Sequence, residues 1–277
     1  MPLIFATLSS VLWGVGDFAG ALAARRAPAV TVVVGAHLTG LVGLAAAAPF
    51  FGDGFAPTAD LGWGALAGLG GSIGIAFLYH ALATTRMSVT APASAVVGTT
   101  VPVLFGLITG ERPASLAWVG MAFAIPALLL IPARRRHGEA SSVAALGYGV
   151  VVGIFLGLFG ILISQTGPAS GVWPLLAARL ASVTLMAVVA LTARRPVVAP
   201  RPAWAFVVWA GVLDTGANVL FLLAVRMELL SLVAVIASLY PASTVALARV
   251  VLGERVHLMQ GVGMMLAAGA VALIAVA

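Results

Sequence analysis

The sequence contains no cysteine and no lysine, and only 8% of its 277 residues carry a charge. Without cysteine the chain can form no disulfide and has no thiolate chemistry, so its redox compartment stays undetermined. Charged residues are scarce, 62% of the residues are hydrophobic, and the mean hydropathy is +1.16. Such a composition excludes an ordinary soluble domain. The sequence therefore predicts an integral membrane protein.

The positive balance of the chain comes entirely from arginine, and the sequence pI is near 11.3. In a soluble protein that value would suggest nucleic-acid binding, but here the arginines cluster in short loops beside apolar runs. There they set orientation and meet anionic lipid headgroups, which excludes a nucleic-acid partner. The first residues carry no basic region and lead into a full-length apolar run, so no cleaved signal peptide is expected.

One motif occurs twice, with an offset of 143 residues from Gly110 to Gly253. In both copies six residues separate Gly-Glu-Arg from a following Val-Gly-Met. Each copy lies between two apolar runs, so the repeated unit is a hydrophobic helix, a polar turn and a second hydrophobic helix. The same offset also pairs Ser88 with Ser231, Ala91 with Ala234, Ala81 with Ala224, Gly68 with Gly211 and Pro57 with Pro200.

A membrane-spanning helix needs about 20 predominantly apolar residues. Charged or Pro/Gly-rich turns divide this sequence into ten such segments, joined by short connections that leave no room for an extramembrane domain. The predicted spans are roughly 3–23, 29–51, 61–83, 89–109, 116–132, 144–164, 172–192, 203–225, 232–252 and 259–277.

Five spans per copy is an odd number, so the second copy must enter the membrane from the side opposite the first. The expected fold is all-α integral membrane, with ten transmembrane helices in two inverted five-helix repeats. The first repeat covers residues 1–132, a basic linker covers 133–143, and the second repeat covers 144–277. Many secondary transporters have this architecture, with a pseudo-two-fold axis in the membrane plane and a site between the halves.

The loop arginines predict the orientation of the chain. Ten of them lie on the side opposite the N-terminus and two on the N-terminal side. Basic loops face the cytoplasm, so both termini are expected on the non-cytoplasmic side of the cytoplasmic (inner) membrane. The ten are Arg25, Arg26, Arg86, Arg134, Arg135, Arg136, Arg194, Arg195, Arg201 and Arg255, and the two are Arg112 and Arg226.

Several of these features resemble a known family. The features that carry the resemblance are ten helices in two inverted repeats, Trp13 and Gly14 in the first span, Leu82 closing the third, Pro241 in the ninth and a Gly-Glu turn before the fifth and tenth. With them the chain resembles the EamA branch of the drug/metabolite transporter superfamily. The resemblance covers essentially the whole chain. It implies an exporter of amino acids, other metabolites or drugs.

The chain departs from the family pattern at two places. The pattern often has an arginine in the second helix of each repeat; the second copy has Arg179, whereas the first has His37 nearby. Pro241 aligns with Gly98, and the first copy instead carries Pro102 four residues later. Both departures concern the substrate and its coupling rather than the fold.

Polar groups within spans are informative, because a charge at a helix centre costs roughly 2.5 to 3.5 kcal/mol on insertion scales. Asp17, His37 and His80 all lie toward the predicted cytoplasmic ends of the first three spans, where they could form one polar cluster. Asp17 and a histidine would then bind or relay a proton, as a coupling site. The alternative is structural, with Asp17 hydrogen-bonding a histidine to hold the first two spans together.

Asp214 lies near the centre of the eighth span and shares one helix face with Asn218 and Phe221. A lipid-facing aspartate is implausible there. Asp214 either lines the cavity and touches substrate or pairs with Arg179, and both hold if the bridge forms in only one state.

By the resemblance, further residues line the transport path, and their aromatic faces and hydroxyls suit an amphipathic small molecule. They are Tyr79, His80, Thr99, Thr100 and Tyr240. The alternative for Tyr79 is an aromatic residue of the membrane interface, because it lies close to the end of its span.

The resemblance also implies that Trp13 lies in the cavity wall, with packing filler as the alternative. Pro102 and Pro241 each break one backbone hydrogen bond and are candidate pivots. Glu111 and Glu254 directly precede the fifth and tenth spans, so each is expected to cap that helix, with a gate carboxylate as the competing reading.

These observations predict a secondary transporter that exports small, amino-acid-like organic metabolites by alternating access. Export of lipophilic cations or drugs is the alternative. An intramembrane enzyme is disfavoured because the sequence has no HExxH motif and no paired aspartates on facing spans at comparable depth. The expected partners are a small-molecule substrate, the lipid bilayer and a proton as candidate coupling ion, without cofactor or metal. The predicted cavity residues are Trp13, Asp17, Tyr79, His80, Thr99, Asp214, Asn218 and Tyr240.

Overall fold

The structure is a computed structural model of the whole chain, and it describes residues 1–50, 56–84, 87–130, 142–252 and 258–277. Glu254, Arg255 and nearly all of the predicted linker lie outside the described residues. The described part is helical, without strands. Its α-helices are α1 (Pro2–Ala24), α2 (Ala29–Ala47), α3 (Thr58–Thr84), α4 (Met87–Ile108), α5 (Ser115–Leu130), α6 (Ser142–Ser164), α7 (Trp173–Thr192), α8 (Trp204–Val225), α9 (Leu230–Ala237), α10 (Pro241–Leu252) and α11 (Leu258–Ala275).

Many of these helices are long and apolar. In the described residues, six are long and apolar enough to cross a membrane, and four shorter apolar segments lie on α4, α5, α9–α10 and α11. Large apolar side chains also cover the outside of the bundle; Trp209 is 60% exposed and Ile108 is 84% exposed. An apolar exterior of this kind suits lipid rather than water. The chain is a multi-pass membrane protein.

The predicted span 232–252 is not one helix, and this corrects the sequence-based expectation. It lies on α9 and α10, which are separated by a turn at Ser238–Tyr240. Within the turn the Leu239 and Tyr240 amides donate to carbonyls only three residues back. Pro241 begins α10 and has no amide hydrogen to continue the ladder, so the helix breaks before it. Each of the other nine predicted segments has most of its described residues on one α-helix, although Ala48–Phe50 at the end of the second form a short 3-10 helix.

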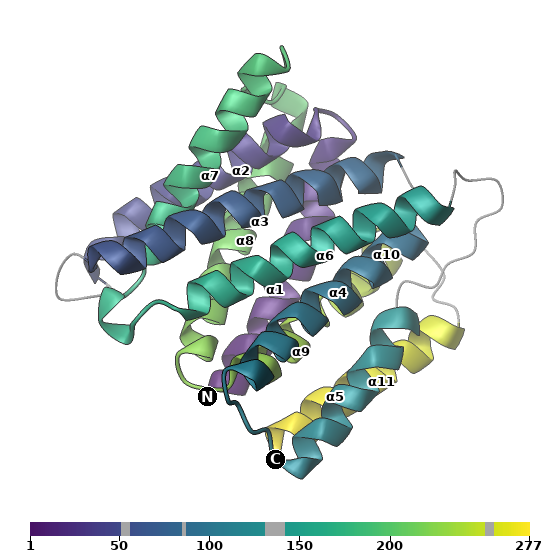
Figure 1. Cartoon of the computed structure of the whole chain (residues 1–277). Helices are drawn as coiled ribbons and strands as arrows, with labels where there is room; N and C mark the ends of the chain where they lie inside the picture. Colours follow the sequence, from purple (N-terminus) through teal and green to yellow (C-terminus); the bar gives the residue numbers. More distant parts are fainter. Residues whose placement is uncertain (51–55, 85–86, 131–141, 253–257) are drawn as a thin grey trace.

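Helices from the two halves of the chain interleave (Figure 1). α1 packs on α8 and α6 on α3, while α4 packs on α6 and α1 on α9 and α10. α2 lies against α7, and α5 and α11 pair at one edge of the bundle (Figure 1). A Cβ atom added at Gly68 would lie 2.0 Å from the Ala178 carbonyl oxygen, so glycine is what lets α3 and α7 approach so closely.

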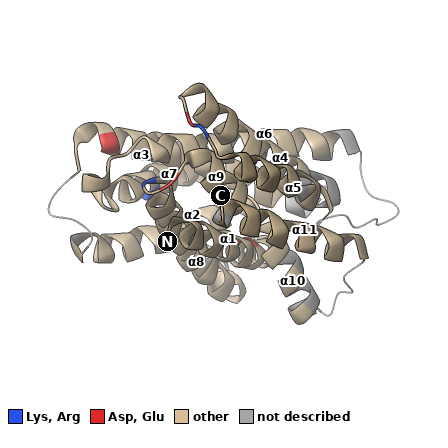
Figure 2. Ribbon diagram, turned by 90° about the horizontal axis from the view of Figure 1, so that it is seen from below, with Lys and Arg blue, Asp and Glu red and all other residues tan. Residues whose placement is uncertain are grey.

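Both termini lie at the same end of the bundle (Figure 1). Seen from that end, charged positions are few against an otherwise uncharged ribbon (Figure 2). We call this end the terminal end.

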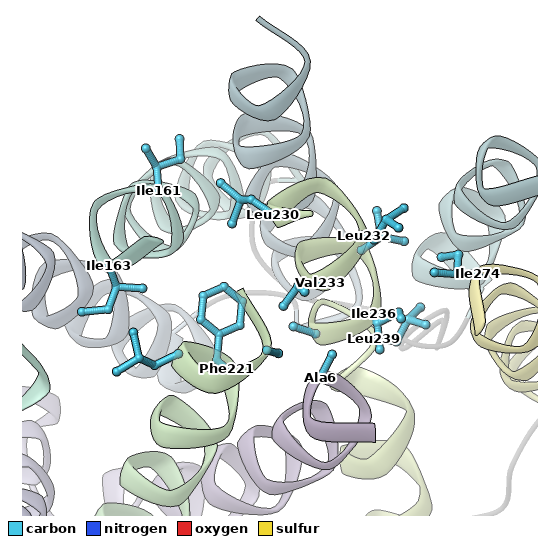
Figure 3. Close-up of a cluster of buried hydrophobic side chains, with 14 of the residues drawn as sticks. Ala6, Ile161, Ile163, Phe221, Leu230, Leu232, Val233, Ile236, Leu239 and Ile274 are labelled. Carbon is cyan, nitrogen blue, oxygen red and sulfur yellow. The ribbon is translucent and has the colours of Figure 1, made fainter. Parts of the chain in front are cut away.

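A buried apolar cluster surrounds the short helix α9 (Figure 3). All eight residues of α9 are buried, so the helix has protein on every side rather than lipid. Phe221 of α8, Ile163 of α6 and Ala6 of α1 belong to the same cluster. α9 is therefore a central element whose position depends on its neighbours.

Candidate functional site

A cavity lies between helices of both halves and encloses about 960 Å³, including its open mouth. α1 to α4 contribute walls from the first half, and α6 to α9 contribute walls from the second. The structure brings many of the residues singled out in the sequence to this one place. Those that line the cavity are Trp13, Asp17, His37, Pro102, Arg179, Asp214, Asn218 and Tyr240.

The ion pair of the cavity joins α7 to α8. Arg179 Nη2 donates to Asp214 Oδ2, and His37 Nε2 of α2 lies 4.0 Å from the same oxygen. His37 Nδ1 is 2.6 Å from the Ser182 hydroxyl oxygen on α7. Arg179 and His37 are buried, so their charges and polar groups are compensated inside the protein rather than by water. Asp214 therefore pairs with Arg179 and also lines the cavity, while its contact with a substrate stays a prediction.

Room for the Arg179 side chain comes from a glycine on the facing helix. A Cβ atom added at Gly40 of α2 would lie 2.1 Å from the Thr215 hydroxyl oxygen and 3.2 Å from Arg179 Nε. Any larger residue would therefore push α2 away from α7 and α8. Gly40 thus positions the ion pair without a polar atom of its own.

Asp17 is the second carboxylate of the cavity and lies one turn beyond Trp13 on α1. Within the described residues it forms no ion pair and no side-chain hydrogen bond, so the expected bond to a histidine is not seen there. Unlike Asp214, Asp17 is paired with no arginine in the part of the chain that the structure describes.

The predicted cluster of Asp17, His37 and His80 is not formed. His80 is exposed, and its ring centroid lies 5.6 Å from that of Tyr148 on α6. On α3 the cavity is lined by Ser72 and Ile75. His80 is five positions beyond Ile75, so on a helix with 3.6 residues per turn its side chain points in a different direction. His80 therefore lies outside the cavity wall.

Aromatic side chains form the wall nearer the terminal end. The ring centroids of Trp13 and Phe221 are 5.3 Å apart, and those of Phe159 and Phe221 are 6.5 Å apart. Asp214 and Phe221 lie two turns apart on one face of α8, with Asn218 between them. The cavity is therefore amphipathic along its length, charged near Asp214 and aromatic near Phe221.

Two residues expected in the cavity lie beside it instead. Tyr79 is 4% exposed, too buried for an interfacial aromatic residue, and fills the space against Gly20, where an added Cβ atom would lie 2.1 Å from its hydroxyl oxygen. Thr99 donates to the Ser238 hydroxyl oxygen across 2.5 Å, so it touches the cavity only through Ser238. Thr100 is exposed and bonds its own helix at the Val96 carbonyl.

The two prolines differ in effect. Pro102 lines the cavity inside the continuous helix α4, whereas Pro241 begins α10 just after the break, next to the cavity residue Tyr240.

Sequence reasoning missed several cavity residues. Ser182 lies one turn beyond Arg179 on the same face of α7, and that spacing could have identified it. Phe159 and Leu156 lie in α6, which is apolar on all sides, so no pattern distinguishes its cavity face from its lipid face.

Glu111 does not cap the helix that follows it, which corrects the expectation from the sequence. Its two carboxylate oxygens accept from the backbone amides of Leu230 (2.7 Å) and Ser231 (2.9 Å), in the first turn of α9. The bond crosses from the α4–α5 loop to the second half of the chain. The corresponding expectation for Glu254 lies outside the described residues.

Other polar contacts join loops at the same end. Asp60 Oδ2, in the first turn of α3, accepts from the Gly167 amide (2.9 Å) and the Ser170 hydroxyl. Arg226, just after α8, donates to the Gly171 carbonyl oxygen across 2.8 Å. Burial lowers the pKa of Arg226 below its usual value, and nearby Asp60 acts in the opposite direction. These bonds hold the α6–α7 loop over the terminal end of the bundle.

Comparison with known proteins assigns the chain to a family. The family model described as EamA-like transporter family matches residues 1–132 and again residues 143–276. A solved structure titled only "Crystal structure of protein" is similar in fold, with a TM-score of 0.79 and 16% sequence identity over 99% of this chain and 98% of that one. No curated protein matches the sequence. The two family matches together cover nearly the whole chain, and the protein belongs to the EamA-like transporter family, a group of transporters of the drug/metabolite type.

Proposed function

We propose that this protein is a secondary transporter that exports small, amino-acid-like metabolites across the cytoplasmic membrane by alternating access. The observation that carries the proposal is the cavity itself. Its walls come from both halves of the chain, and it holds an ion pair, a separate carboxylate and an aromatic wall. Polar groups of this kind inside a membrane bundle mark a substrate or ion path.

The arrangement of helices supports ten spans in two inverted repeats, residues 1–132 and 144–277. In this proposal α1 corresponds to α6, α3 to α8, and α4 to α9 with α10. When the halves are exchanged, the α1–α8 contact becomes the α6–α3 contact. The α4–α6 contact becomes the contacts of α1 with α9 and α10. α2–α7 and α5–α11 are each converted into themselves. An axis relating the halves in this way would place the cavity where both can rock around it.

An amino acid matches the charges of the cavity. Its ammonium could pair with Asp214 while its carboxylate pairs with Arg179, so one internal ion pair would be exchanged for two pairs with substrate without a change of net charge. The aromatic wall would receive an apolar side chain. In this proposal Asp17 is left free to exchange a proton with the solvent.

A lipophilic cation is the second candidate, and the position of Asp17 favours it. Asp17 pairs with no arginine of the described segments and lies one turn from Trp13, so the two would offer charge and an aromatic face to one bound cation. Such a substrate would not need Arg179.

Transport in reconstituted vesicles separates these candidates. Radiolabelled amino acids and organic cations are tested with the parent protein and with Arg179→Gln. Loss of amino-acid transport in the variant supports the first candidate, and cation transport that survives the substitution supports the second. If the folded parent protein moves no compound in a broad panel, the proposed function is wrong.

A further inference from the structure

The Gly-Glu-Arg motif has a defined local structure at residues 110–112. Gly110 has a positive φ of 101°, and the Glu111 amide donates to the Gly106 carbonyl oxygen across 2.9 Å. This is the geometry of a Schellman motif, in which glycine supplies the left-handed residue that ends a helix. The motif turns the Glu111 side chain back along α4. A Cβ atom added at Gly106 would lie 2.3 Å from Glu111 Oε2, so Gly106 leaves the space that the carboxylate occupies.

α9 needs the carboxylate because it has no cap of its own. Its N-cap residue, Leu229, makes no side-chain capping bond, and the first amides of any helix have no partner within the helix. Leu230 and Ser231 are buried, so water cannot satisfy their amides. Glu111 accepts from both, and its negative charge also suits the positive end of the helix.

The other end of α9 borders the cavity. Ala234 and Ala237 line it, and Ser238, directly after the helix, lines it as well. Ser238 accepts a hydrogen bond from Thr99 of α4. α9 is therefore attached to the α4 region at both ends, through Glu111 at the terminal end and through Thr99 at the cavity. Figure 3 shows apolar side chains of α9, among them Leu230 and Val233, in the buried cluster.

We propose that Glu111 is a positioning residue for transport: its carboxylate holds α9 against α4 from the other half of the chain and so sets the cavity wall that α9 forms. The inference rests on the proposed function for its consequence in transport. The attachment itself stands on the geometry alone. In alternating access the same bond must loosen when the halves part at the terminal end.

Ser231→Cys offers a direct reporter, because the chain has no cysteine of its own. Ser231 is fully buried, and within the described residues its hydroxyl makes no hydrogen bond, so the substitution removes no hydrogen bond. The thiol is expected to react only when the start of α9 opens. A membrane-impermeant maleimide is added to vesicles, and a separate Ala277→Cys protein identifies the terminal side.

In the Ser231→Cys background, Glu111→Gln keeps one acceptor oxygen without the charge, and Glu111→Ala removes both acceptors. We expect the labelling rate to rise in the order parent, Gln, Ala, by at least about tenfold for Ala, because two charge-assisted hydrogen bonds are lost. Glu228→Gln is the matched control. Glu228 lies close to α9 in the chain, but within the described ranges its carboxylate accepts only from the adjacent Leu229 amide, so its variant should label at the parent rate.

Transport provides the second measurement. Glu111→Gln should raise KM for a transported substrate several-fold, whereas a residue that merely stabilises its loop would lower the yield of folded protein and leave KM unchanged. Labelling of the folded Glu111 variants at the parent rate overturns the proposal, and if only one variant folds, that variant decides. Labelling needs no substrate, so a parent protein that transports nothing but shows the expected labelling order contradicts the proposed function alone.

Discussion

His37 on α2 and Ser182 on α7 share a hydrogen bond of 2.6 Å, which joins the two halves of the chain beside the cavity. The second ring nitrogen of His37 faces Asp214, whose carboxylate is already paired with Arg179. Ser182 thus orients the histidine against the ion pair. The four side chains form one polar network inside an apolar bundle.

Ser182→Ala should destabilise the protein by about 1 kcal/mol, because it leaves a buried histidine nitrogen without its partner. Thermal unfolding in detergent measures the change. Thr184→Ala is the control, since Thr184 bonds only its own helix at the Leu180 carbonyl and is exposed. Equal losses in the two variants would mean that the bond between the halves adds nothing specific.

Asp214→Asn should weaken substrate binding at every pH and lower stability by about 3–5 kcal/mol, because Arg179 is left buried without its counter-ion. The double variant with Arg179→Gln removes the isolated charge and should recover part of the stability but not the binding. Ligand binding and unfolding are measured on the same preparations. Normal binding by folded Asp214→Asn would exclude the carboxylate from the substrate site.

Asp17→Asn should remove the pH dependence of transport while leaving substrate binding largely intact. The reason is that Asp17 lines the cavity and pairs with no arginine among the described residues, so we expect it to take up and release a proton there. Uptake is measured over a range of pH with and without an imposed proton gradient. A pH profile identical to that of the parent protein would assign the coupling elsewhere, and fully active transport by both aspartate variants would favour a facilitated carrier.

Both termini are predicted to face away from the cytoplasm, because ten of the twelve loop arginines lie on the opposite side in the predicted topology. A reporter that is active only in the cytoplasm, fused after Ala277, should therefore show little activity. The same reporter inserted in the α7–α8 loop beside Arg195 should be active. Strong activity of the fusion at Ala277 would reverse the orientation.

The sequence alone located most of the described helices, although not the break between α9 and α10, and the reason is physical. Inside lipid every backbone amide and carbonyl must be satisfied within its own segment, so apolar length and helix-breaking turns mark the segments directly. Helical spacing also placed Asp214, Asn218 and Phe221 on one face of α8, where Asp214 and Phe221 mark the charged and aromatic parts of the cavity wall. The 143-residue offset indicated two related halves, and the family model matches once in each.

What the sequence could not decide is which helices are neighbours. Lipid is as apolar as the helix surfaces, so hydrophobicity does not distinguish a face that packs on protein from one that faces the membrane. Phe159 therefore gave no signal in α6, and His80, polar and near the end of α3, was expected in a cavity that it does not reach. Glu111 was expected to cap the helix that follows it in the chain. Only the tertiary structure brings α9, with its uncapped and buried first turn, within reach of that carboxylate.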